Sequence, residues 1–239
     1  MSRSQTPTRW PNGLTNAAPA NLVLHKYPLP FEMKDVTQWW SDFDRYRSAD
    51  WTVTTVGTGT VAEIAGVGGL IRLATSAGAT DAIYMDKVGE QFQFVTGAQV
   101  WFQGRFRVSD AVNTELVGGL QITDTAPMAV SDGVYFHKPS GAARLFLVQV
   151  SAATGLTTTT DTGVDVASNA FATAGYFYDA NGTVFWAIKD TNGVVVGDGS
   201  APANLPTVTL TPSLGILNAA AAIHDLDIDY VFVAQNLVR

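Results

Sequence analysis

The sequence of 239 residues contains no cysteine and has few charged residues. The lack of cysteine excludes disulfide bonds, zinc–thiolate sites and thiol nucleophiles. Charged residues make up 15% of the chain, where about 25% is usual, and this excludes a coiled coil and a charged disordered chain. At this length we expect one domain, or at most two small ones, able to bury a core without a metal or a disulfide.

Basic residues are the scarcer of the two charged classes. The 14 Lys and Arg are outnumbered by 21 Asp and Glu, and the net charge is −7. Such a chain is poorly suited to neutralising phosphates, so we expect neither nucleic acid nor a membrane as a partner. No apolar run reaches the roughly 18 residues of a membrane helix, and the N-terminal stretch MSRSQTPTRWPNGL lacks the apolar core of a secretory signal. We therefore expect a soluble protein made without an export signal.

Motifs for catalysis and cofactor binding are absent as well. The chain has three histidines, no G-x-S-x-G around a serine, no H-E-x-x-H and no phosphate-binding loop. The glycines of segment 66–69 lie between predicted strands and predict a tight turn. We therefore predict no enzymatic activity, no catalytic or cofactor-binding residue, no cofactor and no metal site. A calcium site built from the loop carboxylates Asp124 and Asp132 is a minor alternative.

Prolines are concentrated near the N-terminus, where five of the ten lie before residue 31. Proline fixes φ and removes an N–H donor, so regular structure is not expected there. A disordered leader is one interpretation. The many apolar side chains favour another, an extended arm over residues 1–40 that lies on a neighbouring subunit. The residues predicted to bind this partner are Trp10, Leu22, Leu24, Tyr27, Leu29 and Phe31.

The stretch FEMKDVTQWWSDFDRY (31–46) has apolar residues at three- and four-residue steps. This spacing predicts one or two short helical turns at the end of the arm. We expect Trp39, Trp40 and Trp51 to cover the edge of a core. An exposed aromatic platform for sugars is the alternative.

From Trp51 onward the sequence is typical of β-structure. Thr- and Val-rich alternating segments are separated by glycines about every ten residues, and Asn-Gly pairs in 179–182 and 190–193 predict tight hairpins. The Thr-rich patch 157–163 is interpreted as a flexible or edge loop. We predict an all-β domain over residues 41–239 with two packed antiparallel sheets. The strands expected after the first are 70–75, 82–88, 90–95, 98–110, 115–124, 133–139, 143–151, 176–190 and 224–235.

Three aspartates alternate with apolar residues near the C-terminus. On a strand, Asp225, Asp227 and Asp229 would form an acidic row, with Leu226, Ile228 and Tyr230 on the other face. The row is loosely similar to the E-x-D-x-E box of β-glucanases, where paired carboxylates act as nucleophile and acid. That family has Glu at the outer positions and places the box centrally, so we favour a final strand with one solvated face, which could bind a cation or pair with a basic neighbour. Arg105 and Arg107 also share a strand face, which we expect to be solvated, and a salt bridge to an acidic strand is the alternative.

A set of longer segments carries a resemblance to known folds. The segments VWFQGRFRVSD (100–110), ELVGGLQITDTAP (115–127), SDGVYFHKPSG (131–141) and RLFLVQV (144–150) are followed by AGYFYDANGTVFWAIKD (174–190) and LDIDYVFVAQ (226–235). Together they resemble a concanavalin/laminin-G-like jelly-roll sandwich. With the entry WWSDFDRYRSADWTVT (39–54), they also resemble the decoration or cement proteins on the capsids of tailed bacteriophages.

This resemblance implies a function without a catalytic residue. We expect a structural virion protein, assembled in the host cytoplasm, that binds the capsid exterior and stabilises it by bridging neighbouring subunits. Its expected partners are the major capsid protein and itself, as a homodimer or homotrimer, because modest contacts add up over many symmetric sites. The alternatives are a carbohydrate-binding, lectin-like module of a phage head or fibre and, less favoured, a glycoside hydrolase using Asp225, Asp227 and Asp229.

Overall fold

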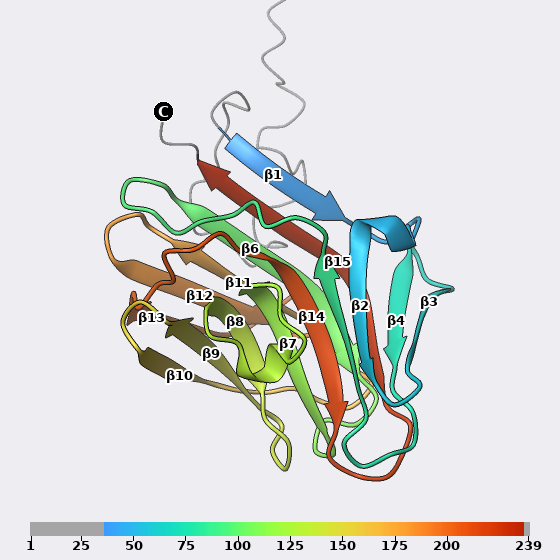
Figure 1. Ribbon diagram of the computed structural model, residues 1–239. Helices are drawn as coiled ribbons and strands as arrows, with labels where there is room; N and C mark the ends of the chain where they lie inside the picture. Colours follow the sequence, from blue (N-terminus) through green and yellow to red (C-terminus); the bar gives the residue numbers. More distant parts are fainter. Residues whose placement is uncertain (1–35, 237–239) are drawn as a thin grey trace, which may run out of the picture.

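Two antiparallel β-sheets packed face to face make up residues 36–236, the part of the chain described by the computed structural model (Figure 1). The first sheet, sheet A, contains β1 (Val36–Ser41), β3 (Thr60–Ile64), β4 (Leu70–Ala74), β6 (Val100–Val108), β11 (Ala172–Tyr178), β12 (Thr183–Lys189), β13 (Val195–Pro202) and β15 (Asp225–Asn236). The second sheet, sheet B, contains β2 (Trp51–Val56), β5 (Ala82–Lys87), β7 (Thr114–Gln121), β8 (Gly133–Lys138), β9 (Arg144–Ser151), β10 (Leu156–Asp165) and β14 (Thr211–Asn218).

The strand order explains how distant parts of the chain come together. Sheet A runs β13-β12-β11-β6-β15-β4-β3, with β1 also paired to β15, and sheet B runs β10-β9-β8-β7-β14-β5-β2. Within residues 36–236 there are also two 3-10 helices, η4 (Ser48–Asp50) and η5 (Pro127–Ala129). Of the helices within residues 36–236, none is long and apolar enough to cross a bilayer. The predicted pair of antiparallel sheets is confirmed.

Alternation along the strands builds the core between the sheets. On β6, Phe102 and Phe106 point into the core, whereas Trp101 points away from it. Tyr176 of β11 is fully buried; its ring stacks on Phe102 at 5.3 Å, and its hydroxyl donates to the carbonyl of Val134 in the opposite sheet at 2.9 Å. A buried tyrosine thus satisfies its polar end and ties the two sheets together.

The predicted turns are confirmed. The 179–182 turn joins β11 to β12, and the 190–193 turn joins β12 to β13. Positive φ angles fall on Ala180, Gly182 and Gly193. The Gly-rich segment 66–69 forms the turn between β3 and β4. Tight hairpins need such backbone angles, which is why the Asn-Gly pairs located these turns correctly.

Two local predictions were wrong. The segment 31–46 was expected to form helical turns, but Val36–Ser41 is a strand that pairs antiparallel with β15. Strand pairing outweighs the weak helical period here, because it places Trp39 towards the core and Trp40 on the outer side. The Thr-rich patch is no loop, because it lies in β10, the edge strand of sheet B. The predicted partner-binding residues Trp10, Leu22, Leu24, Tyr27, Leu29 and Phe31 lie outside the described residues.

Candidate functional site

The predicted acidic row lies on β15, but each carboxylate faces a guanidinium. Asp227 is 2% exposed and accepts hydrogen bonds from Arg72 Nε at 2.6 Å and Arg107 Nε at 2.8 Å. Asp225 pairs with Arg72 at 3.0 Å, and Asp229 pairs with Arg105. The three aspartates therefore form a row of ion pairs with Arg72 on β4 and with Arg105 and Arg107 on β6, which we call the charge ladder. This is the pairing with a basic neighbour that the sequence analysis left open.

One part of the predicted alternation fails at a β-bulge. Leu226 and Ile228 lie in the core as expected, but the register shifts between Ile228 and Tyr230, so that Asp229 is an extra residue. Tyr230 consequently does not share the inner face. Its hydroxyl accepts a hydrogen bond from Gln103 at 2.6 Å on the outer side of sheet A. A bulge lets two consecutive side chains lie on one side of a strand.

An aromatic ring packs against two arginines of the charge ladder. The guanidinium carbons of Arg105 and Arg107 lie 4.2 and 4.8 Å from the centre of the Phe171 ring, where cations are attracted to the π face. Burial raises the pKa of Asp227, but the hydrogen bonds and charges of Arg72 and Arg107 outweigh it and hold the pKa below its usual value. Asp227 therefore stays ionised and bound to Arg72 and Arg107.

A second group of polar side chains lies on the outer face of sheet B. Glu115 and His137 hydrogen-bond at 2.8 Å through His137 Nε2, and both side chains are about one-fifth exposed. The tyrosines Tyr84 and Tyr135 lie beside them and are buried; burial and, secondarily, the Glu115 charge raise the pKa of Tyr135 to about 12. This face therefore carries a partly exposed imidazole–carboxylate pair.

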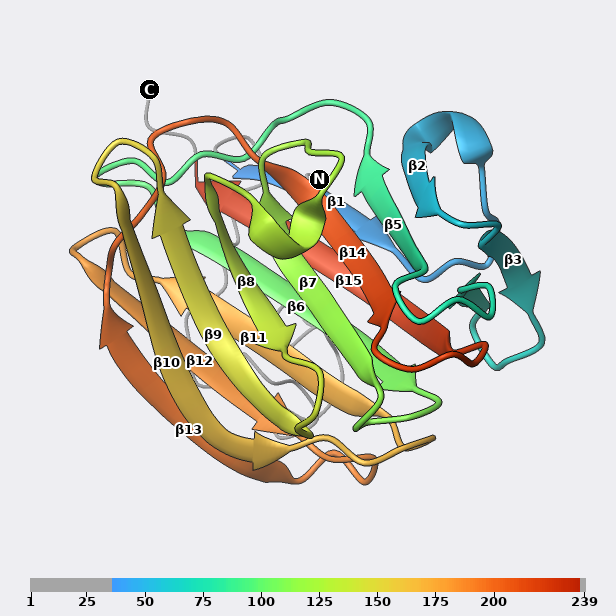
Figure 2. The same ribbon diagram turned by 60° about the horizontal axis from the view of Figure 1, so that its bottom comes forward.

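Glycines stand where a larger residue would collide with these tyrosines. A Cβ added to Gly119 would lie 2.4 Å from Tyr135 Cα, and one added to Gly215 would lie 2.4 Å from a Tyr84 ring carbon. Figure 2 shows the loop that carries η5 lying over this sheet. Ile122, Met128 and Val130 of that loop pack against the cluster around Tyr135. The loop therefore covers Tyr135 and withdraws it from solvent.

We expect Gly119→Ala to destabilise the protein by about 1–3 kcal/mol, because the clash is with backbone atoms that cannot rotate away. Gly118→Ala is the matched control. Its Cβ would meet only Leu214 Cδ2, at 3.6 Å, an ordinary contact. Urea unfolding of both variants measures the difference. Equal stabilities would show that sheet B can shift around Tyr135.

The loop carboxylates Asp124 and Asp132 each accept a backbone hydrogen bond. Asp124 Oδ1 accepts the N–H of Ala126 at 2.9 Å, and Asp132 Oδ1 accepts the N–H of Ala152 at 3.0 Å. Within residues 36–236, no group of three or more His, Cys, Asp or Glu side chains is placed to hold a metal ion. The calcium alternative thus gains no support from this loop.

Asp86 is a buried carboxylate that the sequence did not single out. It lies on β5 opposite Ser213 of β14 and is 1% exposed, and neither of its oxygens has a hydrogen-bond partner among residues 36–236. Burial raises its pKa to about 6. The side chain of Ser213 lowers the pKa, and the negative charges of Asp124 and Glu90 raise it. An unpaired buried acid stores unfavourable free energy at neutral pH.

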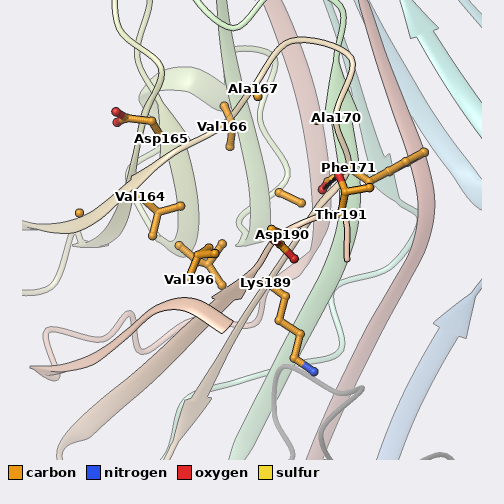
Figure 3. Close-up of a pocket in the computed structure, with 13 residues that line it drawn as sticks. Val164, Asp165, Val166, Ala167, Ala170, Phe171, Lys189, Asp190, Thr191 and Val196 are labelled. Carbon is orange, nitrogen blue, oxygen red and sulfur yellow. Dashed lines mark hydrogen bonds between the residues drawn. The ribbon is translucent and has the colours of Figure 1, made fainter. Parts of the chain in front are cut away.

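A pocket of about 290 Å³ opens beside the end of β10 (Figure 3). Two carboxylates in its lining are already engaged: Asp165 pairs with Arg144, and Asp190 accepts two backbone N–H groups of its own turn. The Lys189 side chain runs away from the valines of the wall, and its pKa is lowered to about 8 by burial. The pocket thus offers few polar groups to a ligand. Its apolar walls come mainly from Val164, Val166, Phe171 and Val196.

The outer face of sheet A is apolar beside β1. Trp40 is 60% exposed and is the only aromatic among the exposed large hydrophobic residues of segment 36–236. By contrast, Trp39 packs edge-on against Trp51 at 5.4 Å, so only these two tryptophans cover a core edge as predicted. We call this surface the aromatic face. Two rows of paired residues cross it: Gln38–Ala234–Trp101–Phe177–Phe185 and Trp40–Phe232–Gln103–Gly175–Ala187.

Comparison with known proteins defines the class of fold as a concanavalin-like jelly-roll sandwich. An endo-1,3-β-glucanase from Streptomyces sioyaensis matches with a TM-score of 0.58 and 13% identity, over 89% of this chain and 100% of the other. A Lotus tetragonolobus seed lectin matches at 0.57 and 11% over 85% and 100%, and a lichenase from a mouse hindgut metagenome at 0.56 and 14% over 82% and 98%. No protein-family model and no curated protein matches the sequence. These similarities show the concanavalin-like sandwich fold that the sequence predicted.

The prediction of no enzymatic activity is corrected by these structures. It rested on missing sequence motifs, yet two of the three structures are glucanases with the same fold. One fold hosts many unrelated functions, and the motifs that were searched for represent only some of them, so the absence of motifs was not a sound basis for the prediction. The fold is compatible with sugar binding and with glucan hydrolysis.

Proposed function

We propose that the chain is a structural virion protein that binds the outside of a bacteriophage capsid and bridges neighbouring capsid subunits. The observation that supports this proposal is Trp40, a tryptophan 60% exposed on an apolar sheet face. Tryptophan is enriched among the residues that dominate protein–protein binding, and charged residues are depleted at the centres of interfaces. The low charge of the chain is in keeping with such a surface.

The same proposal includes the capsid exterior as the location, with the major capsid protein and a second copy of the chain as partners. A sandwich whose β15 aspartates are paired with arginines and whose two sheets are tied together by the Tyr176 hydroxyl is a rigid spacer. Contacts of modest strength suffice, because symmetry repeats them over the whole shell.

The test uses phage heads purified from a lysate that lacks this chain. We expect the added protein to bind these heads saturably and to raise the temperature at which they release DNA. Trp40→Ala should weaken binding about tenfold or more, whereas Leu156→Ala, at a residue that is also 60% exposed but lies on β10 of the other sheet, should leave it unchanged. Heads that bind no protein would overturn the proposal.

The second candidate is a carbohydrate-binding module, and the lectin and glucanase neighbours favour it. Trp40 would then stack on a sugar ring. Titration with laminarihexaose and a mixed-linkage β-glucan oligosaccharide, read by calorimetry, tests this, and a reducing-end assay on the same mixtures detects hydrolysis. Binding that is lost in Trp40→Ala supports the candidate. No binding at millimolar sugar ends it.

A further inference from the structure

The aromatic face has a buried part and an exposed part. Trp101 and Ala187 are 0% exposed and Ala234 is 1% exposed, although all three point away from the core between the sheets. The elements described cannot account for this burial: η4 contacts β2, and η5 contacts β7 and β14 of sheet B. No strand or helix of residues 36–236 is stacked on this side of sheet A.

We propose that residues 20–31 of the same chain bind the buried part of the aromatic face. The inference is independent of the capsid proposal. The first described residue, Val36, already packs against the cluster of Trp101 and Ala234. The 35 residues before it therefore begin at the rim of this face, and a tethered segment binds at a high effective concentration.

The length of the segment fits the width of the face. From β1 to β12 there are four strand spacings, about 19 Å at roughly 4.8 Å each. An extended chain advances about 3.3 Å per residue, so the seven residues from Leu29 to Val36 span about 23 Å. Leu29 and the residues before it can therefore reach every strand of the aromatic face.

The chemistry of the segment fits as well. Tyr27, Leu29 and Phe31 are two residues apart, so an extended chain presents them on one side. Pro28 and Pro30 between them favour that extended form and remove N–H groups that would otherwise be buried without a partner. Between its aromatic side chains, the face has small residues at Gly175, Ala187 and Ala234, which leave room for apolar anchors.

The first experiment places a photo-crosslinking phenylalanine analogue at position 232 of the full-length chain. Phe232 is half-buried on the aromatic face beside Trp40. We expect irradiation of the micromolar protein to give crosslinks within one chain to residues 20–31. The same analogue at Leu156, 60% exposed on β10 of the other sheet, should give none. Crosslinked dimers would show that a second copy supplies the segment, and absence of any crosslink to residues 1–35 would show that the segment does not bind there; either overturns the proposal.

The second experiment needs no unnatural residue. In the full chain, Tyr27→Asp with Leu29→Asp should raise binding of a hydrophobic dye several-fold while the far-ultraviolet circular dichroism stays that of a β-protein. Thr15→Asp with Asn21→Asp adds the same charge, at Asn21 in the segment and at Thr15 before it, without removing an apolar side chain, and should leave dye binding unchanged. Equal dye binding by both double variants would contradict the proposal. Neither measurement uses phage heads or sugars, so the outcome is separate from that of the proposed function.

Discussion

Replacing Asp227 with alanine is expected to lower the free energy of unfolding by about 2–4 kcal/mol. The carboxylate is 2% exposed and binds two guanidinium groups. Removing one partner from a buried ion pair leaves the remaining charges uncompensated, which typically costs about 3–5 kcal/mol. We reduce this figure because the side chains of Arg72 and Arg107 are 35% and 31% exposed and are partly hydrated. For a chain of this size, each kcal/mol corresponds to a fall in Tm of about 2–4 °C.

Asp225→Ala is the matched control for this change. Asp225 lies two residues away on β15 and is 25% exposed, and within residues 36–236 its ion pair is with Arg72, so its loss should cost less than about 1 kcal/mol. Urea unfolding at pH 7 compares the two variants. If both lose the same amount, the buried position of Asp227 has no special weight, and the ladder is an ordinary set of surface ion pairs.

The ladder also predicts a dependence on acid. The pKa of Asp227 is lower in the folded state than its ordinary 3.8, so the unfolded chain binds a proton first as the pH falls. This contribution to stability is complete above the unfolded pKa and is lost as the pH falls through the folded pKa. Asp227→Asn should therefore lose less stability than the parent protein between pH 5 and strong acid.

The fold was accessible from the sequence because its signals are local. Alternation, the glycine breaks and the Asn-Gly turns each report on a few neighbouring residues, and they located the β11–β12–β13 hairpins. The strand at Val36–Ser41 was missed because its pairing partner, β15, lies some 190 residues away. A weak helical period is the only signal within the segment itself.

The site was less accessible, since it depends on which strands become neighbours. The row of aspartates was visible in the sequence, but Arg72, on β4, could not be assigned to it before the strand order was known. Trp40 is likewise exposed because its side chain points outward from β1, a short strand that the sequence did not reveal. Asp86 gives no sequence signal at all, because an aspartate becomes costly only when its surroundings bury it.

Asp86→Asn is expected to stabilise the protein at pH 7 by up to about 3 kcal/mol. The folded pKa is about 6 against an ordinary 3.8, so the folded protein holds a proton that the unfolded chain has lost. Stability therefore falls as the pH rises from about 4 to 6 and stays lower above that range. A shift of about two units corresponds to about 3 kcal/mol. Asparagine has the same shape and carries no charge, so the variant escapes this loss.

The dependence of this gain on pH separates the ionisation of Asp86 from a packing effect. Below pH 3.8 both states of the parent protein hold the proton, and the variant and the parent should unfold at the same urea concentration. The difference should then grow through pH 5 and 6 to its full size at pH 7. Asp44→Asn removes the same charge from an exposed position and should show no such growth. A constant difference at every pH would mean that packing around Ser213, rather than the ionisation of Asp86, determines the gain.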